Sequence, residues 1–568
     1  VIRIKTIRQQ GNGLSGNIMT SGKLAKMSSF NQLVVLNWRH NGLDLFGTFN
    51  VRSDGWWMDQ TATSQKYFPV NRVDMTQTAN MRWRSNTIAG KWGFNDQWND
   101  NNSFGVTYSV DKALPSSSIY AHQYYTVYTN GTYTGAVDYD DDESASSTGP
   151  DHELDAYYSG KLGKWTVDIN GTLDWRKTVT SQDATEQSEE FDSRTIKAVN
   201  TRHNRMAAVK LVASYPISDQ IHVNAGTEYT STHSQSVYVN QQNFITSSDD
   251  DIKERNIAAF VAADVQVGKY KIDGGLRYEH VKSDYYSYSV FQDDASRNYS
   301  NLFPNLSILY ANKGWNMSLN FSEKTQRPSY YQLSGFIRYD DRYTCEGGNP
   351  LLQPSKIYNV EWNLQYQWFT LSADYTYHKN QIMYVSSIYQ NSDIVLANYS
   401  NIDHRQEFNF SATASPVFGI WHPQIELDFR KQLLDTAPHG IGVTLQKPQW
   451  DIDMKNTFVF RHQWVLECEY EYSTSYDDCF DRWGKYSELD FNLTKSFLNR
   501  QLTVRLGVID ILNTNKSRDF DHYSACYNFQ KYTRPNDRGV RLTVSYNFNP
   551  TRSKYKGTGA GNEEKKRL

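Results

Sequence analysis

The sequence predicts an all-β fold, a transmembrane antiparallel β-barrel of about 22 strands, and three observations lead to this prediction. Polar and apolar residues alternate along many stretches of about ten residues or more. The connections between these stretches alternate between a short class and a long class. Aromatic residues make up 14% of the 568 residues, with 40 Tyr and 15 Trp. A soluble β-sandwich has shorter strands and no rule that places every long loop at one end.

Residues 164–177, KWTVDINGTLDWRK, show the alternation clearly. Trp165 and Ile169 fall on one side of this stretch, and Asp168 and Asp174 fall on the other. A period of two indicates a β-strand with one apolar face and one polar face. A tilted strand needs about 9–11 residues to cross a membrane, with its apolar side chains toward lipid and its polar ones toward the lumen.

The same alternation recurs from the first hairpin to the end of the chain. Asn41-Gly42 is a two-residue turn suited to a type I′ hairpin, and apolar residues alternate with polar ones on both sides of it. Further strands that follow the rule are predicted at 221–229, 270–279 and 539–548. Tyr and Trp are expected to form the aromatic girdles at the two membrane interfaces.

The connections predict the number of strands and their orientation. Short turns are expected near 41–42, 99–102, 160–163, 217–220, 268–269, 312–314, 367, 417–420, 461–463 and 497–500. Longer links are expected near 26–29 and at 58–75, 115–148, 179–199, 236–253, 286–299, 326–355, 383–395, 433–447, 474–483 and 513–533. Roughly ten turns and eleven loops make about 22 strands, with short periplasmic turns and long extracellular loops.

Composition agrees with this class of protein. The net formal charge is -3, which gives no support for a nucleic-acid partner. The mean hydropathy is -0.70, and no run approaches the roughly 18 apolar residues of a membrane helix. A barrel explains this low value because half of each strand faces water. Residue 1 opens directly into the alternation VIRIKTI, without a signal-peptide pattern, as expected of a processed or trimmed chain.

Three stretches carry a resemblance to a known family. They are RPSYYQL…YTCEGGNPLLQPSKIYNVEW (327–362), LTKSFLNRQLTVRLGVIDILNTN (493–515) and the ending VSYNFNPTRSKYKGTGAGNEEKKRL. The chain resembles the C-terminal barrel of TonB-dependent receptors, specifically the outer-membrane β-barrel family related to them, over about residues 13–568. The resemblance implies a location in the cell outer membrane.

The same resemblance implies a division of the chain. Residues 1–12 resemble the last strand of a plug domain, whose other residues are missing from this sequence. Residues 13–549 are expected to form the barrel, and residues 550–568 a C-terminal periplasmic tail. A TonB-type energy-transducing protein is the implied partner, acting through the missing plug, together with outer-membrane lipid and a small-molecule or oligomeric nutrient.

Other motifs have simpler explanations. Gly11, Gly13 and Gly16 match a dinucleotide fingerprint, but no helix is predicted after them. The acidic runs at 138–143 and 249–251 lack EF-hand spacing and are better explained as solvated loop faces than as Ca²⁺ sites. No zinc-ligand or G-x-S-x-G pattern is present. We therefore expect no catalytic residue, no metal and no cofactor, and a protein that is not an enzyme.

Aromatic and arginine residues of two long loops are the candidate ligand contacts. Tyr and Arg combine a large contact area with a polar end, as in binding hot spots. An interfacial girdle or packing between loops is the alternative for any one of them. The candidates are Tyr120, Tyr124, Tyr125, Tyr330, Tyr331, Arg338 and Arg342. Cys479 and Cys526 lie in consecutive loops and form a candidate disulfide, with two free thiols as the alternative.

The leading functional hypothesis is a TonB-dependent receptor that takes up a scarce nutrient. Siderophore, vitamin, peptide and glycan all remain open as substrates. The second hypothesis is a surface-display or adhesion barrel that does not transport, and a passive pore is a further alternative.

Overall fold

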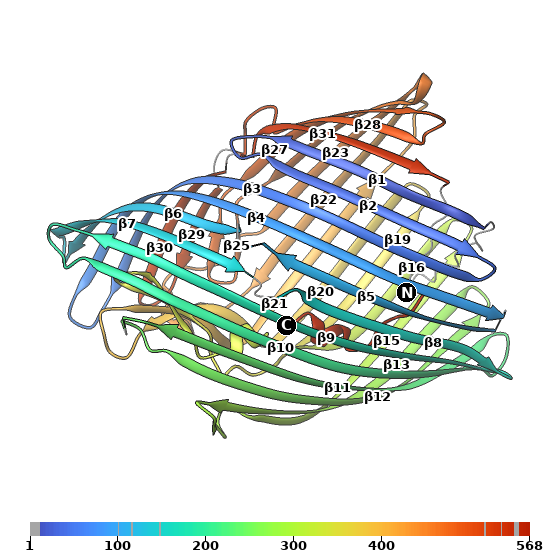
Figure 1. The fold of residues 1–568 in the computed structure, drawn as a ribbon, viewed down its shortest axis with the longest axis horizontal. Helices are drawn as coiled ribbons and strands as arrows, with labels where there is room; N and C mark the ends of the chain where they lie inside the picture. Colours follow the sequence, from blue (N-terminus) through green and yellow to red (C-terminus); the bar gives the residue numbers. More distant parts are fainter. Residues whose placement is uncertain are drawn as a thin grey trace.

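A single antiparallel sheet closes on itself to form the wall of the barrel (Figure 1). The computed structural model describes residues 12–99, 101–114, 117–146, 149–242, 244–515, 518–535, 537–549 and 556–568. The expected plug strand at 1–12 therefore lies almost wholly outside the described residues, as does Gly11. The barrel has 22 wall strands, which confirms the predicted fold class.

The wall strands follow one another around the barrel, each hydrogen-bonded to the next. In that order they are β1 (Gly13–Leu24), β2 (Ser29–His40), β3 (Leu43–Tyr67), β4 (Arg72–Asn99), β5 (Asn102–Ala113), β8 (Asp151–Leu162), β9 (Trp165–Gln187), β10 (Arg194–Pro216), β11 (Ile221–Asn240), β12 (Ser248–Val267), β13 (Tyr270–Ser287), β15 (Arg297–Asn312), β16 (Trp315–Gln326), β19 (Ser355–Tyr366), β20 (Phe369–Ile388), β21 (Val395–Ala414), β22 (Trp421–Leu433), β23 (Gln449–Phe460), β24 (Trp464–Ser473), β27 (Tyr486–Phe497), β28 (Leu502–Ile509) and β31 (Gly539–Phe548). β31 pairs with β1 and closes the ring, with Phe548 opposite Gly16.

The remaining elements lie in the long connections, beside the turns or, for α2, in the segment that follows β31. They are β6 (Ser118–Thr129), β7 (Thr132–Ser146), β14 (Val290–Phe291), β17 (Ile337–Asp341), β18 (Thr344–Gly347), β25 (Tyr476–Asp478), β26 (Asp481–Trp483), β29 (Arg518–Tyr523), β30 (Tyr527–Pro535), the short helices α1 (Tyr330–Leu333) and α2 (Asn562–Lys565), and the 3-10 turns Ala437–His439 and Arg461–Gln463. β6 pairs with β4, and β30 pairs with β3, so these hairpins extend the wall at the long-loop end.

The two faces of the wall have the expected chemistry. Trp165, Ile169 and Leu173 of β9 are 48%, 41% and 45% exposed on the outer face, with no second protein layer over them among the described residues. Asn170 and Thr172, on the inner face, are each only 2% exposed. The apolar half of this strand is therefore free to contact lipid, and the polar half is enclosed.

The predicted hairpin at Asn41-Gly42 forms between β2 and β3. Both residues have positive φ, 47° and 99°, as a type I′ turn requires. Glycine at the second position adopts such an angle without steric cost, and asparagine at the first tolerates it.

Several predicted loops are shorter in the structure than in the sequence analysis. The expected loop 58–75 is strand up to Tyr67 and again from Arg72, so β3 and β4 reach 25 and 28 residues. A membrane crossing needs only about 9–11 residues, so these strands continue well beyond the lipid. The polar, loop-like composition of residues 58–75 reflects exposure to water. It does not mark the end of strand pairing.

No helix among the described residues is both long enough and apolar enough to span a membrane.

The described part of the expected tail, residues 556–568, contacts the inner wall. The backbone N–H groups of Thr558 and Gly559 donate to the Asn170 side chain, and Figure 1 marks the C-terminus over β9 and β10. The tail therefore occupies part of the lumen.

Candidate functional site

The connection between β16 and β19, residues 327–354, folds back into the barrel, and we call it the inward loop. It begins with α1, whose N-cap Ser329 accepts from the backbone N–H of Gln332 and completes a capping box with that residue. The hairpin β17–β18 follows. Sequence reasoning placed this connection among the long loops but could not show that it turns inward.

Hydrogen bonds tie the inward loop to distant parts of the wall. The Gly335 N–H donates to Asp250 of β12 at 2.8 Å, and the Gln182 side chain of β9 donates to the Tyr339 carbonyl at 3.0 Å. β18 pairs in parallel with β21, with Thr344 opposite Val395. Because β9 and β12 lie far from β21 around the ring, the loop crosses the lumen and narrows it.

Glu186 of β9 is the centre of a buried network that includes two candidate residues. Its side chain accepts from the hydroxyls of Tyr125 and Tyr339, each at 2.7 Å. Arg342 pairs with it at 3.0 Å. Tyr125 is fully buried and Glu186 is 1% exposed, so the network docks hairpins β6–β7 and β17–β18 against β9.

A second charged group lies beside this network. Arg338 pairs with Glu143 at 2.6 Å and with Glu346 at 3.3 Å. Burial, together with the carboxylates of Glu346 and Asp341, raises the pKa of Asp340 to about 8. Asp340 therefore carries a proton near neutral pH, in a hairpin with more carboxylates than cations close by.

The two tyrosines of α1 face different surroundings. Tyr330 is buried, with its hydroxyl 3.4 Å from Glu564 and the Arg567 guanidinium 4.5 Å from its ring. Tyr331 is 40% exposed, and the Arg202 guanidinium lies 5.2 Å from its ring. Of this pair, Tyr331 is the one that a molecule in the lumen can touch.

Two of the three candidates on β6, Tyr120 and Tyr124, lie on its more open face. The Tyr120 hydroxyl donates to Asp140 at 2.5 Å, and Arg82 covers its ring at 4.6 Å. Tyr124 is 49% exposed and lines an open recess, which is also lined by Tyr133 and Arg194. The structure thus separates the accessible candidates, Tyr124 and Tyr331, from those used in packing.

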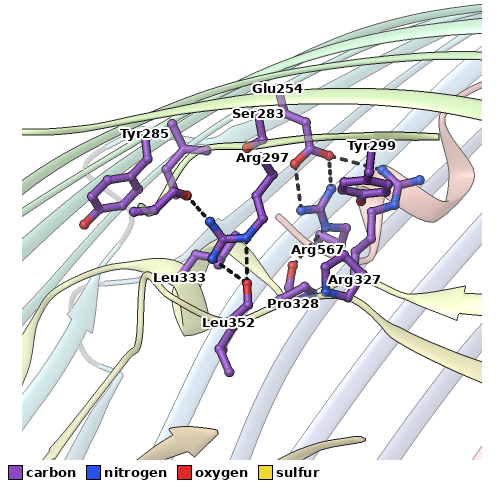
Figure 2. Close-up of a pocket in the computed structure, with 13 residues that line it drawn as sticks. Glu254, Ser283, Tyr285, Arg297, Tyr299, Arg327, Pro328, Leu333, Leu352 and Arg567 are labelled. Carbon is purple, nitrogen blue, oxygen red and sulfur yellow. Dashed lines mark hydrogen bonds and ion pairs between the residues drawn. The ribbon is translucent and has the colours of Figure 1, made fainter. Parts of the chain in front are cut away.

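Sequence reasoning missed a group of four charged side chains in the lumen. Glu254 and Arg327 come from the wall and the inward loop, and Glu564 and Arg567 come from the C-terminal segment. Glu254, Arg327 and Arg567 line a small cavity, in which Arg297 donates to the Leu352 carbonyl (Figure 2). Inward-facing charges on strands were readable from the alternation, but no sequence pattern indicates that the C-terminus returns to them.

Cys479 and Cys526, the candidate disulfide, are free thiols in the structure. They lie on neighbouring hairpins, which are joined by the pairing of β26 with β29. Within the described ranges, no group of three or more His, Cys, Asp or Glu side chains is placed to hold a metal ion.

Comparisons with known proteins agree with this architecture. A model of the outer membrane protein beta-barrel family matches residues 160–546. A search of curated proteins finds no match.

Solved structures share the fold at low sequence identity. The FrpB iron transporter from Neisseria meningitidis (F3-3 variant) is 12% identical, with a TM-score of 0.57, over 95% of this chain and 82% of that one. The copper transporter OprC is 11% identical, with a TM-score of 0.63, over the same shares. The siderophore receptor PirA from Pseudomonas aeruginosa is 10% identical, with a TM-score of 0.55, over 95% and 81%.

Proposed function

The chain belongs to the outer membrane protein beta-barrel family, and from this membership we propose that it is the barrel of a receptor that takes up a scarce nutrient. The resemblance to this family and the outer-membrane location predicted from the sequence are both confirmed. We propose in addition that the barrel transports its nutrient, which is a small molecule or an oligomer.

The observation that carries the proposal is an enclosed polar lumen crossed by the inward loop. Arg277 pairs with Glu228 at 3.0 Å and with Glu279 at 2.6 Å on the inner face, so the wall offers charged groups to a hydrated solute. About 22 strands enclose more space than wall side chains fill. The solved structures of similar fold are named as iron, copper and siderophore transporters or receptors, which supports nutrient uptake as the class of function.

Tyr124 and Tyr331 are the proposed points of first contact with the nutrient. Both are aromatic, exposed and beside a guanidinium or an acidic side chain, so each offers stacking area and nearby charge. Tyr125 and Arg342 would act indirectly, by holding the hairpins in place. Tyr120, Tyr330 and Arg338 have protein partners and would contribute to the shape of the site.

The energy source is part of the proposal. Movement of a scarce solute against its gradient needs work, and the outer membrane holds no ion gradient of its own. We propose a TonB-type partner in the inner membrane that acts through a plug domain. A passive pore would need neither partner nor plug.

An uptake experiment tests the proposal. Cells that express the protein are given labelled ferric siderophore, cobalamin, peptide or oligosaccharide, with and without a protonophore that removes inner-membrane energy. We expect one class to accumulate, and only without protonophore. Accumulation of all the labelled solutes, unaffected by the protonophore, would indicate a passive pore. Binding of a solute at the cell surface without accumulation would indicate a display barrel.

The Tyr331→Ala variant connects the uptake to the site. We expect the apparent affinity of uptake to fall by about tenfold or more, as for an exposed aromatic anchor. Tyr229→Ala is the matched control, because Tyr229 is 43% exposed on the outer face of β11. Equal effects of the two variants would contradict a contact at Tyr331.

A further inference from the structure

The C-terminal segment, defined as residues 556–568, follows the inner wall from the short-turn end toward the middle of the barrel. Lys556 contacts Gln97, near the end of β4 at the turn to β5. The Gly559 N–H donates to Asn170, in the first third of β9. Arg567 reaches Glu254, which lies thirteen residues from the turn end of β12. The segment therefore climbs into the lumen from the side of the short turns.

Side chains of the wall accept hydrogen bonds from backbone N–H groups of the segment. The N–H of Ala560 donates to the Thr172 hydroxyl at 3.2 Å, and the N–H of Gly561 donates to Glu228 at 2.9 Å. Ala560 is fully buried against the inner face. Buried backbone donors that have acceptors are typical of a specific contact. They are not expected of a tail that lies loosely on a surface.

Gly561 is required for this path on two grounds. Its φ is 64°, a left-handed angle that side chains rarely adopt. A Cβ at this position would also lie 2.8 Å from the Cβ of Ala208 in β10. Gly559 has a similar φ of 72°. Only a glycine lets the segment approach β10 this closely.

Charge complementarity fixes the other half of the segment. The Lys565 ammonium lies 3.3 Å from Glu153 and 3.4 Å from Asp155. Arg567 forms a two-pronged contact with Glu254, with one prong at 3.1 Å (Figure 2). Both partners in that pair are less than a tenth exposed. Paired, planar contacts of this kind are the most specific available to an arginine.

The segment also supports the start of the inward loop. The Arg567 Nε donates to the Pro328 carbonyl at 3.0 Å, and the Tyr330 N–H donates to the Arg567 carbonyl at 3.2 Å. Arg327 pairs with Glu564, and Leu568 packs on the cluster that contains Tyr330 and Leu333. The base of α1 thus rests on the last two residues of the chain.

We propose that the inner wall formed by β8–β12 is a binding site for the chain's own C-terminal segment, and that the bound segment holds α1 in place. The segment then links the short-turn mouth of the lumen to the loop that carries Tyr331. Its withdrawal frees α1, and displacement of α1 loosens the segment. This inference concerns the free protein and stands whether or not the barrel transports a nutrient.

Hydrogen–deuterium exchange on the full-length protein in detergent tests the inference. In the unaltered protein we expect the amides of 558–561 to be protected. In Gly561→Ala, and separately in Arg567→Ala, we expect exchange at 558–561 and at 329–334 to speed up by about tenfold. If either variant speeds up exchange both at 558–561 and at 329–334, the C-terminal segment and α1 are coupled.

Two controls separate this result from general damage. Gly442→Ala changes a glycine with open space around it, and Lys566→Ala removes an exposed cation whose one ion pair among the described residues is with nearby Glu563. Neither is expected to alter exchange at 329–334. Each variant must keep the gel mobility of the folded barrel before heating.

Unprotected amides at 558–561 in the unaltered protein would overturn the binding site. Release of the segment without any change at 329–334 would overturn its role in holding α1.

Discussion

At the scale of single residues, the Glu186 carboxylate of β9 joins side chains from two hairpins, β6–β7 and β17–β18. Two tyrosine hydroxyls and one guanidinium converge on it in a place closed to water. A buried charge of this kind is stable only while its partners remain, and removing one partner leaves another unpaired. The position of hairpin β17–β18 therefore depends in part on the Glu186 side chain.

Glu186→Gln is expected to loosen hairpin β17–β18. The neutral amide leaves Arg342 buried without its counter-charge, at a cost of about 3–5 kcal/mol to docking. Limited proteolysis within 336–347 should become much faster. Glu189→Gln, three residues along the chain and exposed, is the matched control. Equal cleavage of the two variants would show that Glu186 does not hold the hairpin.

The docking of the same hairpin is expected to depend on pH through Asp340. Its pKa in the folded protein, about 8, lies above the ordinary value of about 3.9, so the docked hairpin retains a proton that a released hairpin gives up. The docking free energy is therefore most favourable at low pH and weakens as pH rises from about 4 toward 8.

Amide exchange of 337–347, corrected for the intrinsic effect of pH on exchange, measures this dependence. Protection should fall between pH 5 and pH 8, values that lie within the window of about 4 to 8 set by the two pKa values. Asp340→Asn should flatten most of the change. A rise in protection over the same range would contradict the assignment.

At the scale of elements, strand alternation and turn chemistry were readable from the sequence, and strand ends were not. Asn41-Gly42 predicts its turn because a type I′ turn needs a positive φ at two successive residues, and few residue types adopt that angle. The end of β3 was placed too early and the start of β4 too late, because strands that continue into water lose the apolar face that marks them. The hairpin β6–β7 was read as a single loop for the same reason.

The candidate site was only partly predictable. Exposed aromatic loops pointed to Tyr124 and Tyr331, whose side chains are open in the structure. The same pattern also selected Tyr125, because composition does not distinguish the two faces of a hairpin that folds against the wall. The contact between Arg567 and Glu254 joins residues 313 apart, and no local rule connects them.

An arginine on the outer face of β9 is expected to destabilise the barrel. Ile169 lies between Trp165 and Trp175, near the middle of the crossing, where Arg costs about 2–4 kcal/mol. Reversible unfolding of Ile169→Arg in lipid vesicles measures the change in the free energy of unfolding. Val290→Arg, at an exposed loop tip, should cost almost nothing. Similar losses in both would argue that Ile169 does not face lipid.

At the scale of the whole molecule, one closed sheet separates two environments. Every wall strand finds a partner on both sides, and the pairing of β31 with β1 removes the last free edges. Closure allows each backbone N–H and C=O in the hydrocarbon to be paired, which a membrane demands. The lumen then holds charged wall residues, the inward loop and the C-terminal segment, while the outer face carries the aromatic and aliphatic side chains.

The most direct test of this separation is quenching of tryptophan emission by phospholipids brominated on their acyl chains. Trp165, Trp175 and Trp315 are among the exposed side chains of the outer face. In vesicles of brominated lipid, the emission should fall strongly relative to ordinary lipid, because bromine quenches only at contact. Emission of equal strength in the two lipids would mean that the apolar face does not touch hydrocarbon, and the account of this barrel would be wrong.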